Sequence, residues 1–306
     1  MSPATHAPAT LAALIALLAP ISVAHTARAE ATSTPPALMI APGPQDRVLV
    51  IAPHPDDETL CCAGILQRAR ASGAATAIVW ITAGDGFEFD AMLVERTPWP
   101  RQADLRQLGA QRLTEAAAAA VELGVPPALQ YFLGYPDRGV AALMSEFFQR
   151  PYRSSHTGLS AVDYPQALSP HAAYTGSNLE HDLARVIDQF APTLVLAAAP
   201  EDRNPDHHAS GALARRLLEQ RGQLGRLRYW IVHAPHWPRP RGYQPQLALS
   251  PPAVAATLRW ESLPLSDAER AHKLAALAKH RSQMEIMSWY LQSFLRTNEL
   301  FARPPN

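Results

Sequence analysis

Short apolar runs alternate with helix-like segments along most of the 306 residues of the chain. Residues 47–52 (RVLVIA) are apolar after their first position, the pattern of a strand buried on both faces. Similar runs recur, and a helical pattern lies between most of them. The predicted strands cover residues 47–52, 74–82, 129–133, 193–199 and 227–233. The predicted helices cover residues 59–72, 112–123, 177–190 and 206–220, with Ser177 or Asn178 as the cap of the third.

This alternation predicts an α/β fold with a mostly parallel sheet that helices cover on both faces. Two stretches interrupt the pattern. Residues 137–176 carry Pro, Ser, His and Tyr with little periodicity, which is typical of a substrate-binding or lid loop. The Pro-rich residues 239–252 are expected to follow the surface. A long helix from residue 266 to about residue 296 is expected to close the fold.

The first 29 residues have the pattern of a signal peptide. An apolar run at residues 11–24 precedes Ala27-Arg28-Ala29, an A-x-A cleavage pattern, and is too short to span a bilayer comfortably. No Lys or Arg precedes the run, so an uncleaved anchor or a disordered tail remains an alternative. Residues 30–45 are predicted to be a flexible linker, and residues 46–306 the folded domain. We therefore expect an exported, periplasmic or extracellular protein with no stable membrane span after cleavage.

Charge and cysteine content narrow the class of protein further. The 27 basic and 27 acidic residues balance, and the lack of a basic stripe argues against nucleic acid as a partner. The two cysteines, Cys61 and Cys62, are adjacent, whereas a disulfide framework needs spaced pairs. They are interpreted as small buried residues. The oligomeric state is not predicted.

Candidate metal ligands follow two of the predicted strands. His54, Asp56, Asp57 and Glu58 come directly after the first strand, and residues 201–208 (EDRNPDHH) follow the fourth. Ligands of open parallel sheets bind beyond the carboxyl ends of the strands, so both segments are expected at one edge. Two imidazoles and one carboxylate with open coordination positions are typical of a catalytic zinc site.

Each of these signals also has a simpler interpretation. The acids of the first segment suit a helix N-terminus, because the helix dipole favours negative charge there. His207 and His208 suit a solvated helix start. Both coincidences would have to occur at the same edge of the sheet, so a metal site is favoured.

These motifs resemble those of the LmbE/PIG-L family of zinc-dependent N-acetylglucosaminyl de-N-acetylases. The segment VLVIAPHPDDE is similar to the first signature of that family, and residues 204–207 (NPDH) to its second, H-P-D-H. Further similar segments are residues 82–86 (TAGDG), residues 112–115 (RLTE) and residues 132–137 (FLGYPD). The resemblance covers about residues 47–235.

The resemblance implies a Rossmann-like three-layer sandwich that holds zinc, or another divalent metal, through His54, Asp57 and His207. Asp56 is then the general base that takes a proton from the attacking water. Asp206 would orient a ligand histidine. The residues that would contact sugar hydroxyls are Asp85, Arg112 and Asp137. The implied reaction removes an N-acetyl group from an N-acetylglucosamine-type sugar or glycoconjugate.

The second signature departs from the family at its first position, where Asn204 replaces the histidine that stabilises the tetrahedral intermediate. An Asn amide donates a hydrogen bond but cannot shuttle a proton. Either Asn204 acts more weakly, or His208 or His233 takes the role, or the activity is altered. His208 is also a lesser alternative to His207 as the third ligand.

Two other functions remain open. One is a metal-dependent amidase or esterase that acts on a non-sugar substrate, and the other is a catalytically weakened sugar-binding protein on the same scaffold. Asp56 argues against a pure binder, which needs no base beside the ion. The sequence contains no G-x-S-x-G, H-E-x-x-H or P-loop motif. Four aromatic residues could form a stacking wall or a satellite core: Trp99, Tyr135, Tyr152 and Tyr164.

Overall fold

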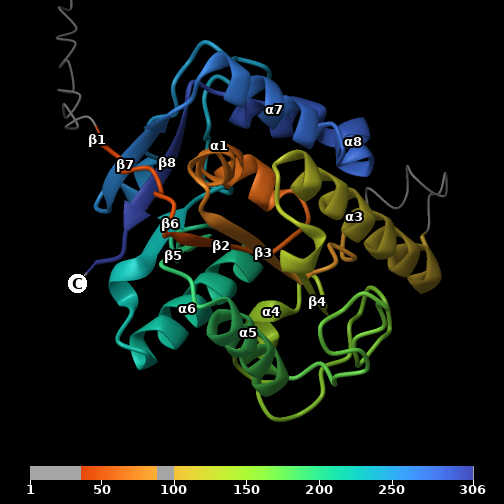
Figure 1. Cartoon of the computed structure of the whole chain (residues 1–306). Coiled ribbons are helices and arrows are strands. Elements are labelled where there is room, and N and C mark those ends of the chain that lie inside the picture. The colour runs from red at the N-terminus through yellow and green to blue at the C-terminus, as the bar shows by residue number, and fades with distance from the viewer. Residues whose placement is uncertain (1–35, 88–99, 306) are drawn as a thin grey trace, which may run out of the picture. The chain divides into compact units, whose positions relative to one another are not determined.

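The computed structural model describes residues 36–87 and 100–305, in which two helical layers enclose one sheet (Figure 1). The order of the eight strands is β1-β7-β8-β6-β5-β2-β3-β4. Every neighbouring pair is parallel except the two that β8 makes, with β6 and with β7. The predicted α/β fold with a mostly parallel sheet is confirmed.

The strands are β1 (Ala37–Leu38), β2 (Arg47–Ala52), β3 (Ala75–Thr82), β4 (Gln130–Tyr135), β5 (Leu194–Ala198), β6 (Leu227–Trp230), β7 (Arg259–Pro264) and β8 (Asn298–Arg303). The helices are α1 (Asp57–Ser72), α3 (Gln102–Glu122), α4 (Val140–Leu143), α5 (Gly176–Phe190), α6 (Pro205–Gln220), α7 (Asp267–Leu277) and α8 (Arg281–Leu291).

The helices divide between the two faces of the sheet. In Figure 1, α1, α3, α7 and α8 lie above the central strands, and α4, α5 and α6 lie below them. Residues 48–52 of β2 are completely buried, as the continuous apolar pattern requires of a strand covered on both faces. From β2 the chain runs outward through β3 and β4, and then returns to place β5 on the other side of β2. A topological switch point therefore lies between β2 and β5.

A close approach of α6 to β5 fixes the start of that helix. Gly211 faces the end of the strand, and a Cβ at this position would lie only 2.0 Å from the carbonyl oxygen of Ala198. A larger residue would push the helix away from the sheet. Glycine thus holds the first turn of α6, with its histidines, close to the carboxyl end of β5.

The C-terminal part of the chain differs from the single long helix predicted for residues 266–296. The helical pattern breaks between α7 and α8, His280 caps α8 with non-helical angles, and Met287 also leaves helical geometry. Strands β7 and β8 were not predicted. Elsewhere α3 begins ten residues before the predicted start, and Thr175, in place of Ser177 or Asn178, caps α5 by accepting a hydrogen bond from the Asn178 N–H.

Two predictions concern the N-terminal part of the chain. The predicted signal peptide at residues 1–29 lies outside the described residues. Part of the predicted linker at residues 30–45 is ordered in the sheet, because Ala37 and Leu38 pair in parallel with Glu261 and Ser262 of β7. Within residues 36–87 and 100–305, no helix is long and apolar enough to cross a membrane.

The interpretation of the two cysteines as small buried residues is confirmed, but the bond between them was not predicted. Cys61 and Cys62 are buried in α1 and joined to each other by a disulfide. A disulfide framework needs cysteine pairs spaced along the chain, but a single disulfide can also join two cysteines that are adjacent in sequence. The bond links no distant segments, so it does not staple the fold.

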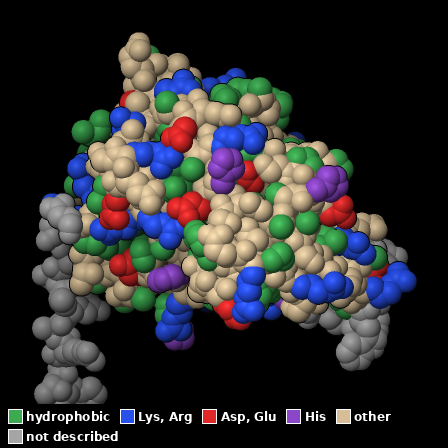
Figure 2. Space-filling model, turned by 90° about the horizontal axis from the view of Figure 1, so that it is seen from below, with side chains coloured by type: hydrophobic (Ala, Val, Ile, Leu, Met, Phe, Trp, Pro, Cys, Tyr) green, Lys and Arg blue, Asp and Glu red, His purple; other side chains and the backbone are tan. Residues whose placement is uncertain are grey.

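The molecular surface carries both signs of charge. Figure 2 shows basic and acidic side chains interspersed over the face seen from below. This mixture agrees with the equal numbers of basic and acidic residues in the sequence.

A buried ion pair joins the C-terminal elements to α1. Lys273 Nζ of α7 lies 2.8 Å from Glu299 Oε1 of β8 and also donates to the Leu60 carbonyl oxygen. Glu299 accepts hydrogen bonds from the N–H groups of Gly64 and Ile65. Both charged side chains are about 1% exposed. Three elements distant in sequence therefore meet at one desolvated pair.

We expect Lys273→Met to lower the free energy of unfolding by about 3–5 kcal/mol, because it leaves a buried carboxylate without its cation. The measurement is urea denaturation. Lys279→Met is the matched control, since Lys279 lies on the surface 3.6 Å from Glu122 and its loss should cost less than about 1 kcal/mol. Equal losses in the two variants would contradict this role of Lys273.

Candidate metal centre and active-site cavity

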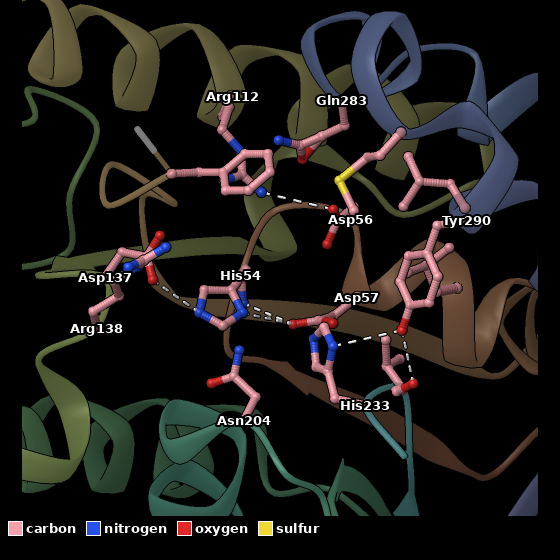
Figure 3. Close-up of a pocket in the computed structure, with 15 residues that line it drawn as sticks. His54, Asp56, Asp57, Arg112, Asp137, Arg138, Asn204, His233, Gln283 and Tyr290 are labelled. Atoms are coloured by element: carbon pink, nitrogen blue, oxygen red, sulfur yellow. Dashed lines mark hydrogen bonds and ion pairs between the residues drawn. The ribbon is translucent and has the colours of Figure 1, made fainter. Parts of the chain in front are cut away.

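The predicted metal ligands meet at the switch point between β2 and β5, where Figure 3 shows His54 and Asp57. His54 lies in the turn after β2, Asp57 is the first residue of α1, and His207 is in the first turn of α6. His54 is 8% exposed, Asp57 1% and His207 0%. Strand pairing thus brings together side chains from two segments far apart in sequence.

Three potential ligand atoms converge on one point. His54 Nδ1 lies 3.1 Å from His207 Nε2 and 3.4 Å from Asp57 Oδ2, and His207 Nε2 lies 3.2 Å from Asp57 Oδ2. Tetrahedral zinc with bonds of about 2.0–2.1 Å holds its ligand atoms about 3.3 Å apart. The donor set and its spacing therefore fit zinc without rearrangement of the three side chains.

The opposite nitrogen of each imidazole faces a carboxylate. His54 Nε2 lies 3.2 Å from Asp137 Oδ1 and 3.4 Å from Asp206 Oδ2. His207 Nδ1 lies 3.2 Å from Asp202 Oδ2. A ligating histidine needs such a partner to fix its tautomer and ring orientation.

His54, Asp137 and Asp206 are also close enough together to hold an ion. Asp206, however, already accepts hydrogen bonds from the N–H groups of Arg138 and Val140, and Asp137 accepts one from the Gly86 N–H. These two carboxylates are therefore better explained as support for His54. Asp206 has the orienting position predicted for it. Asp202 has the same position at His207, which the sequence did not predict.

Asp56 lies beside the three converging ligand atoms without joining them. Its backbone has a φ of 123°, which is strained for a residue with a side chain. Glu58 Oε2 accepts a hydrogen bond from the Asp56 N–H at 3.1 Å, and Arg112 Nη2 lies 3.6 Å from Asp56 Oδ2. These contacts hold a carboxylate toward the cavity, free of the metal position.

Glu58 is part of a buried network that reaches α8. Besides the Asp56 N–H, its carboxylate accepts hydrogen bonds from Trp80 Nε1 and the Thr59 hydroxyl, and it lies 2.9 Å from His280 Nε2. Burial opposes charge on both groups, yet mutual attraction raises the pKa of His280 and lowers that of Glu58. Glu58 thus connects Asp56 to His280 at the start of α8.

The electrostatics of the centre favour a cation. Burial and the charge of Asp57 raise the pKa of Asp56 to about 7. Burial also opposes ionisation of Asp57, but His207 and His54 hold its pKa well below the usual range. Burial lowers the pKa of His207, whereas Asp57 and Asp202 raise it, to about 9. A bound metal ion would supply the positive charge that the proton of His207 supplies in its absence.

The centre opens into a cavity of about 220 Å³. One part of its lining is polar and the other, which comes largely from α8, is apolar. The polar residues are His54, Asp56, Asp57, Arg112, Asp137, Arg138, Asn204, His233 and Gln283. The remaining lining residues are Leu60, Phe87, Val232, Met287, Tyr290 and Leu291. The cavity therefore has room for a small ligand with both polar and apolar faces.

Asn204 has two functions at the start of α6. Its Oδ1 accepts a hydrogen bond from the Asp206 N–H and so caps the helix. This bond sets the orientation of the amide, because the oxygen is the acceptor. The nitrogen then points toward His54 (Figure 3). Asn204 consequently presents a hydrogen-bond donor to the cavity.

His233 also faces the cavity, whereas His208 does not line it. The His233 ring centroid is 4.6 Å from that of His207, and Nδ1 lies 3.5 Å from the Tyr290 hydroxyl. Burial and the nearby His207 lower the pKa of His233 to about 4, so it is neutral near pH 7. Asp202 holds its backbone by accepting a hydrogen bond from the His233 N–H. His208 Nδ1 instead lies 2.7 Å from the Pro200 carbonyl oxygen.

The three predicted sugar contacts have different positions. Arg112 and Asp137 line the cavity, but Arg112 also donates to the carbonyl oxygens of Gly84 and Pro55. Asp85 is fully buried behind the cavity, where it accepts hydrogen bonds from the Tyr164 hydroxyl and the Asp137 N–H. Asp85 is thus part of the supporting wall, and its predicted sugar contact is corrected.

Of the two interpretations of the aromatic residues, a stacking wall or a satellite core, the described ones fit the core. Tyr135 is buried and donates to Asp182, and Tyr164 is buried against Asp85. Tyr152 packs edge-on against Phe147. None of these three lines the cavity. Trp99 lies outside the described residues.

A protein-family model described as PIG-L, GlcNAc-PI de-N-acetylase, matches residues 49–218. Among curated proteins, none matches this chain in sequence. Its fold is similar to that of the A40926 pseudoaglycone deacetylase Dbv21, with a TM-score of 0.55 and 19% identity over 85% of this chain and 97% of that chain.

Two other solved structures share the fold. Teicoplanin deacetylase Orf2, in a zinc inhibited form, has a TM-score of 0.54 and 19% identity over 84% of this chain and 97% of that chain. N,N'-diacetylchitobiose deacetylase from Pyrococcus horikoshii has a TM-score of 0.50 and 19% identity over 84% of this chain and 82% of that chain.

We expect His207→Ala to abolish stoichiometric zinc binding, because it removes one of the three converging ligand atoms. His208→Ala is the control, and it should retain its zinc because His208 lies outside the cavity lining. Metal content after dialysis is the measurement. Equal zinc loss in the two variants would exclude His207 as the specific ligand.

Proposed function

This chain belongs to the PIG-L family of de-N-acetylases, and we propose that it uses zinc to remove the acetyl group from an N-acetylglucosamine-type sugar or glycoconjugate. As a member of this family it is a metal-dependent deacetylase that hydrolyses an amide bond. The zinc, the kind of sugar and the roles of individual residues are the parts that we propose.

One observation carries the proposal. Two imidazole nitrogens and one carboxylate oxygen lie 3.1–3.4 Å apart, and an uncoordinated carboxylate, that of Asp56, lines the same cavity. Three protein ligands with open positions are typical of catalytic zinc, and a base beside them serves hydrolysis. A pure binding site has no need of that base.

A zinc ion held by His54, Asp57 and His207 would act as a Lewis acid and would lower the pKa of its water toward neutrality. Asp56 takes the proton of the attacking water and later delivers it to the departing amine nitrogen. Arg112 keeps the carboxylate in place and favours its charged form.

Negative charge develops on the acetyl oxygen as water attacks. We assign the stabilisation of this charge to the Asn204 amide nitrogen and to the neutral His233 ring. The two side chains line the cavity on the side of α6 and β6, whereas Asp56 lies nearer Arg112 (Figure 3). Fixed donors of this kind stabilise a transition state because they need no reorganisation.

The chemistry of the lining supports a sugar substrate. Asp137 offers a hydrogen-bonding carboxylate at one side of the cavity, while Met287, Tyr290 and Leu291 offer an apolar surface at the other. By their names, the deacetylases of similar fold act on A40926 pseudoaglycone, on teicoplanin and on N,N'-diacetylchitobiose. The apolar run at residues 11–24 supports an exported enzyme and an extracytoplasmic glycan as its substrate.

The direct test is acetate release from a panel of N-acetylated sugars. We expect release by the zinc-loaded protein, none by the metal-free protein, and a kcat about 10²- to 10⁴-fold lower for Asp56→Asn with unchanged zinc content. Asp163→Asn, a change on the exposed part of the long loop, is the control and should match the parent protein. Full release by metal-free protein would refute the mechanism, and release from no sugar would favour a non-sugar amide or ester substrate.

Asn204→Asp separates the two functions of Asn204. Asp accepts the capping hydrogen bond as well as Asn does, but it lacks the donor. We expect kcat to fall about 10²- to 10³-fold while the melting temperature and zinc content stay near those of the parent protein. An unchanged kcat would remove Asn204 from the catalytic machinery.

A further inference from the structure

Arg138 lines the cavity with a guanidinium group that has no partner among the described residues. Among the described lining residues, the basic side chains are Arg112 and Arg138. Arg112 is committed to two carbonyl oxygens and to Asp56. The side chain of Arg138 is exposed, and no hydrogen bond or ion pair engages its guanidinium among the described residues.

The backbone holds Arg138 in an unfavourable conformation. Its φ is 60°, a region that side chains other than those of Asn, Asp and His seldom adopt. Asp206 fixes this turn by accepting hydrogen bonds from the N–H groups of Arg138 and Val140, at 2.6 and 3.1 Å. The carboxylate that supports His54 therefore also sets the direction of Arg138.

Gly86 leaves room for the stem of this arginine. A Cβ added at Gly86 would lie 3.2 Å from Cγ of Arg138 and 3.1 Å from Cγ of Asp137. Any larger residue in the turn after β3 would crowd both side chains. Two backbone features, the turn at Arg138 and the glycine beside it, thus place a cation at the cavity.

Arg138 lies on the opposite side of the centre from His233 and Tyr290 (Figure 3). The cavity therefore has the guanidinium of Arg138 beside the Asp137 carboxylate at the end of β4, and an apolar side at α8. Guanidinium binds carboxylate and phosphate through paired, charge-assisted hydrogen bonds. A neutral sugar would leave this group without a partner of opposite charge.

We propose that Arg138 is a specificity-determining residue that binds an anionic group, carboxylate or phosphate, on the N-acetylated sugar. The proposal rests on the deacetylase function proposed above and narrows its substrate class to acidic amino sugars. Arg138 contacts a part of the substrate away from the acetyl group, so it contributes to binding more than to the chemical step.

The experiment compares Arg138→Gly with the parent protein on three probes: N-acetylglucosamine, N-acetylmuramic acid and N-acetylglucosamine 6-phosphate. Glycine suits the positive φ and removes only the side chain, so the variant is expected to fold. We expect kcat/KM for the preferred acidic probe to fall about 10- to 100-fold, mainly through KM, with neutral sugar unaffected. Comparison of the two acidic probes identifies carboxylate or phosphate as the preferred group.

Arg138→Lys keeps a point charge and should restore part of the lost preference. Arg203→Ala is the matched control, because Arg203 is an exposed arginine outside the cavity lining, and its loss should leave the preference intact. Equal effects of Arg138→Gly on neutral and acidic probes, or no preference of the parent protein for an acidic probe, would overturn the proposal.

Calorimetric binding of the same three sugars distinguishes a failure of this inference from a failure of the proposed function. Acetate release without an acidic preference refutes only the role of Arg138. If no sugar releases acetate, acidic sugars that bind the parent protein at least tenfold more tightly than Arg138→Gly still support the anionic site. Equal binding by the two proteins refutes it.

Discussion

The parallel pairing of β2 with β5 brings His54 within 3.1 Å of His207, although 153 positions of sequence separate them. The α1 and α6 helices begin at this place, and their N-terminal dipoles disfavour a cation. Four carboxylates offset that effect: Asp57, Asp137, Asp202 and Asp206. The N-termini of the two helices thus attract carboxylates, and the carboxylates together make the site attractive to a cation.

The metal ligands were predictable because they follow a rule of sheet geometry. Side chains just beyond the ends of neighbouring parallel strands share one edge, so His54 and His207 could be paired without coordinates. Asp202 could not be assigned in this way, because its orientation depends on the turn after β6. Its carboxylate accepts hydrogen bonds from the N–H groups of Val232 and His233 in that turn. Asp85 resembled a cavity residue, but a tyrosine 79 positions later covers it.

The part of the fold after β6 was predicted least well. Residues 266–296 have helical periodicity, and nothing local marks the break that separates α7 from α8. Lys273 and Glu299 look like surface charges in sequence, yet they are buried against each other. The motif resemblance also weakens after about residue 235, while α8 supplies Tyr290 to the cavity. The chemistry therefore depends on local motifs, and the shape of the cavity on long-range packing.

The position of β8 in the sheet has a consequence for folding. This strand follows all the others in the chain but lies between β6 and β7, so β7 and its neighbour β1 join the sheet only through it. Until residues 298–303 pair with β6, the β6 edge of the part built from β2 to β6 is open. Unpaired strand edges are sites of aggregation. Strand β8 thus covers the β6 edge and also attaches β7 and β1 to the sheet.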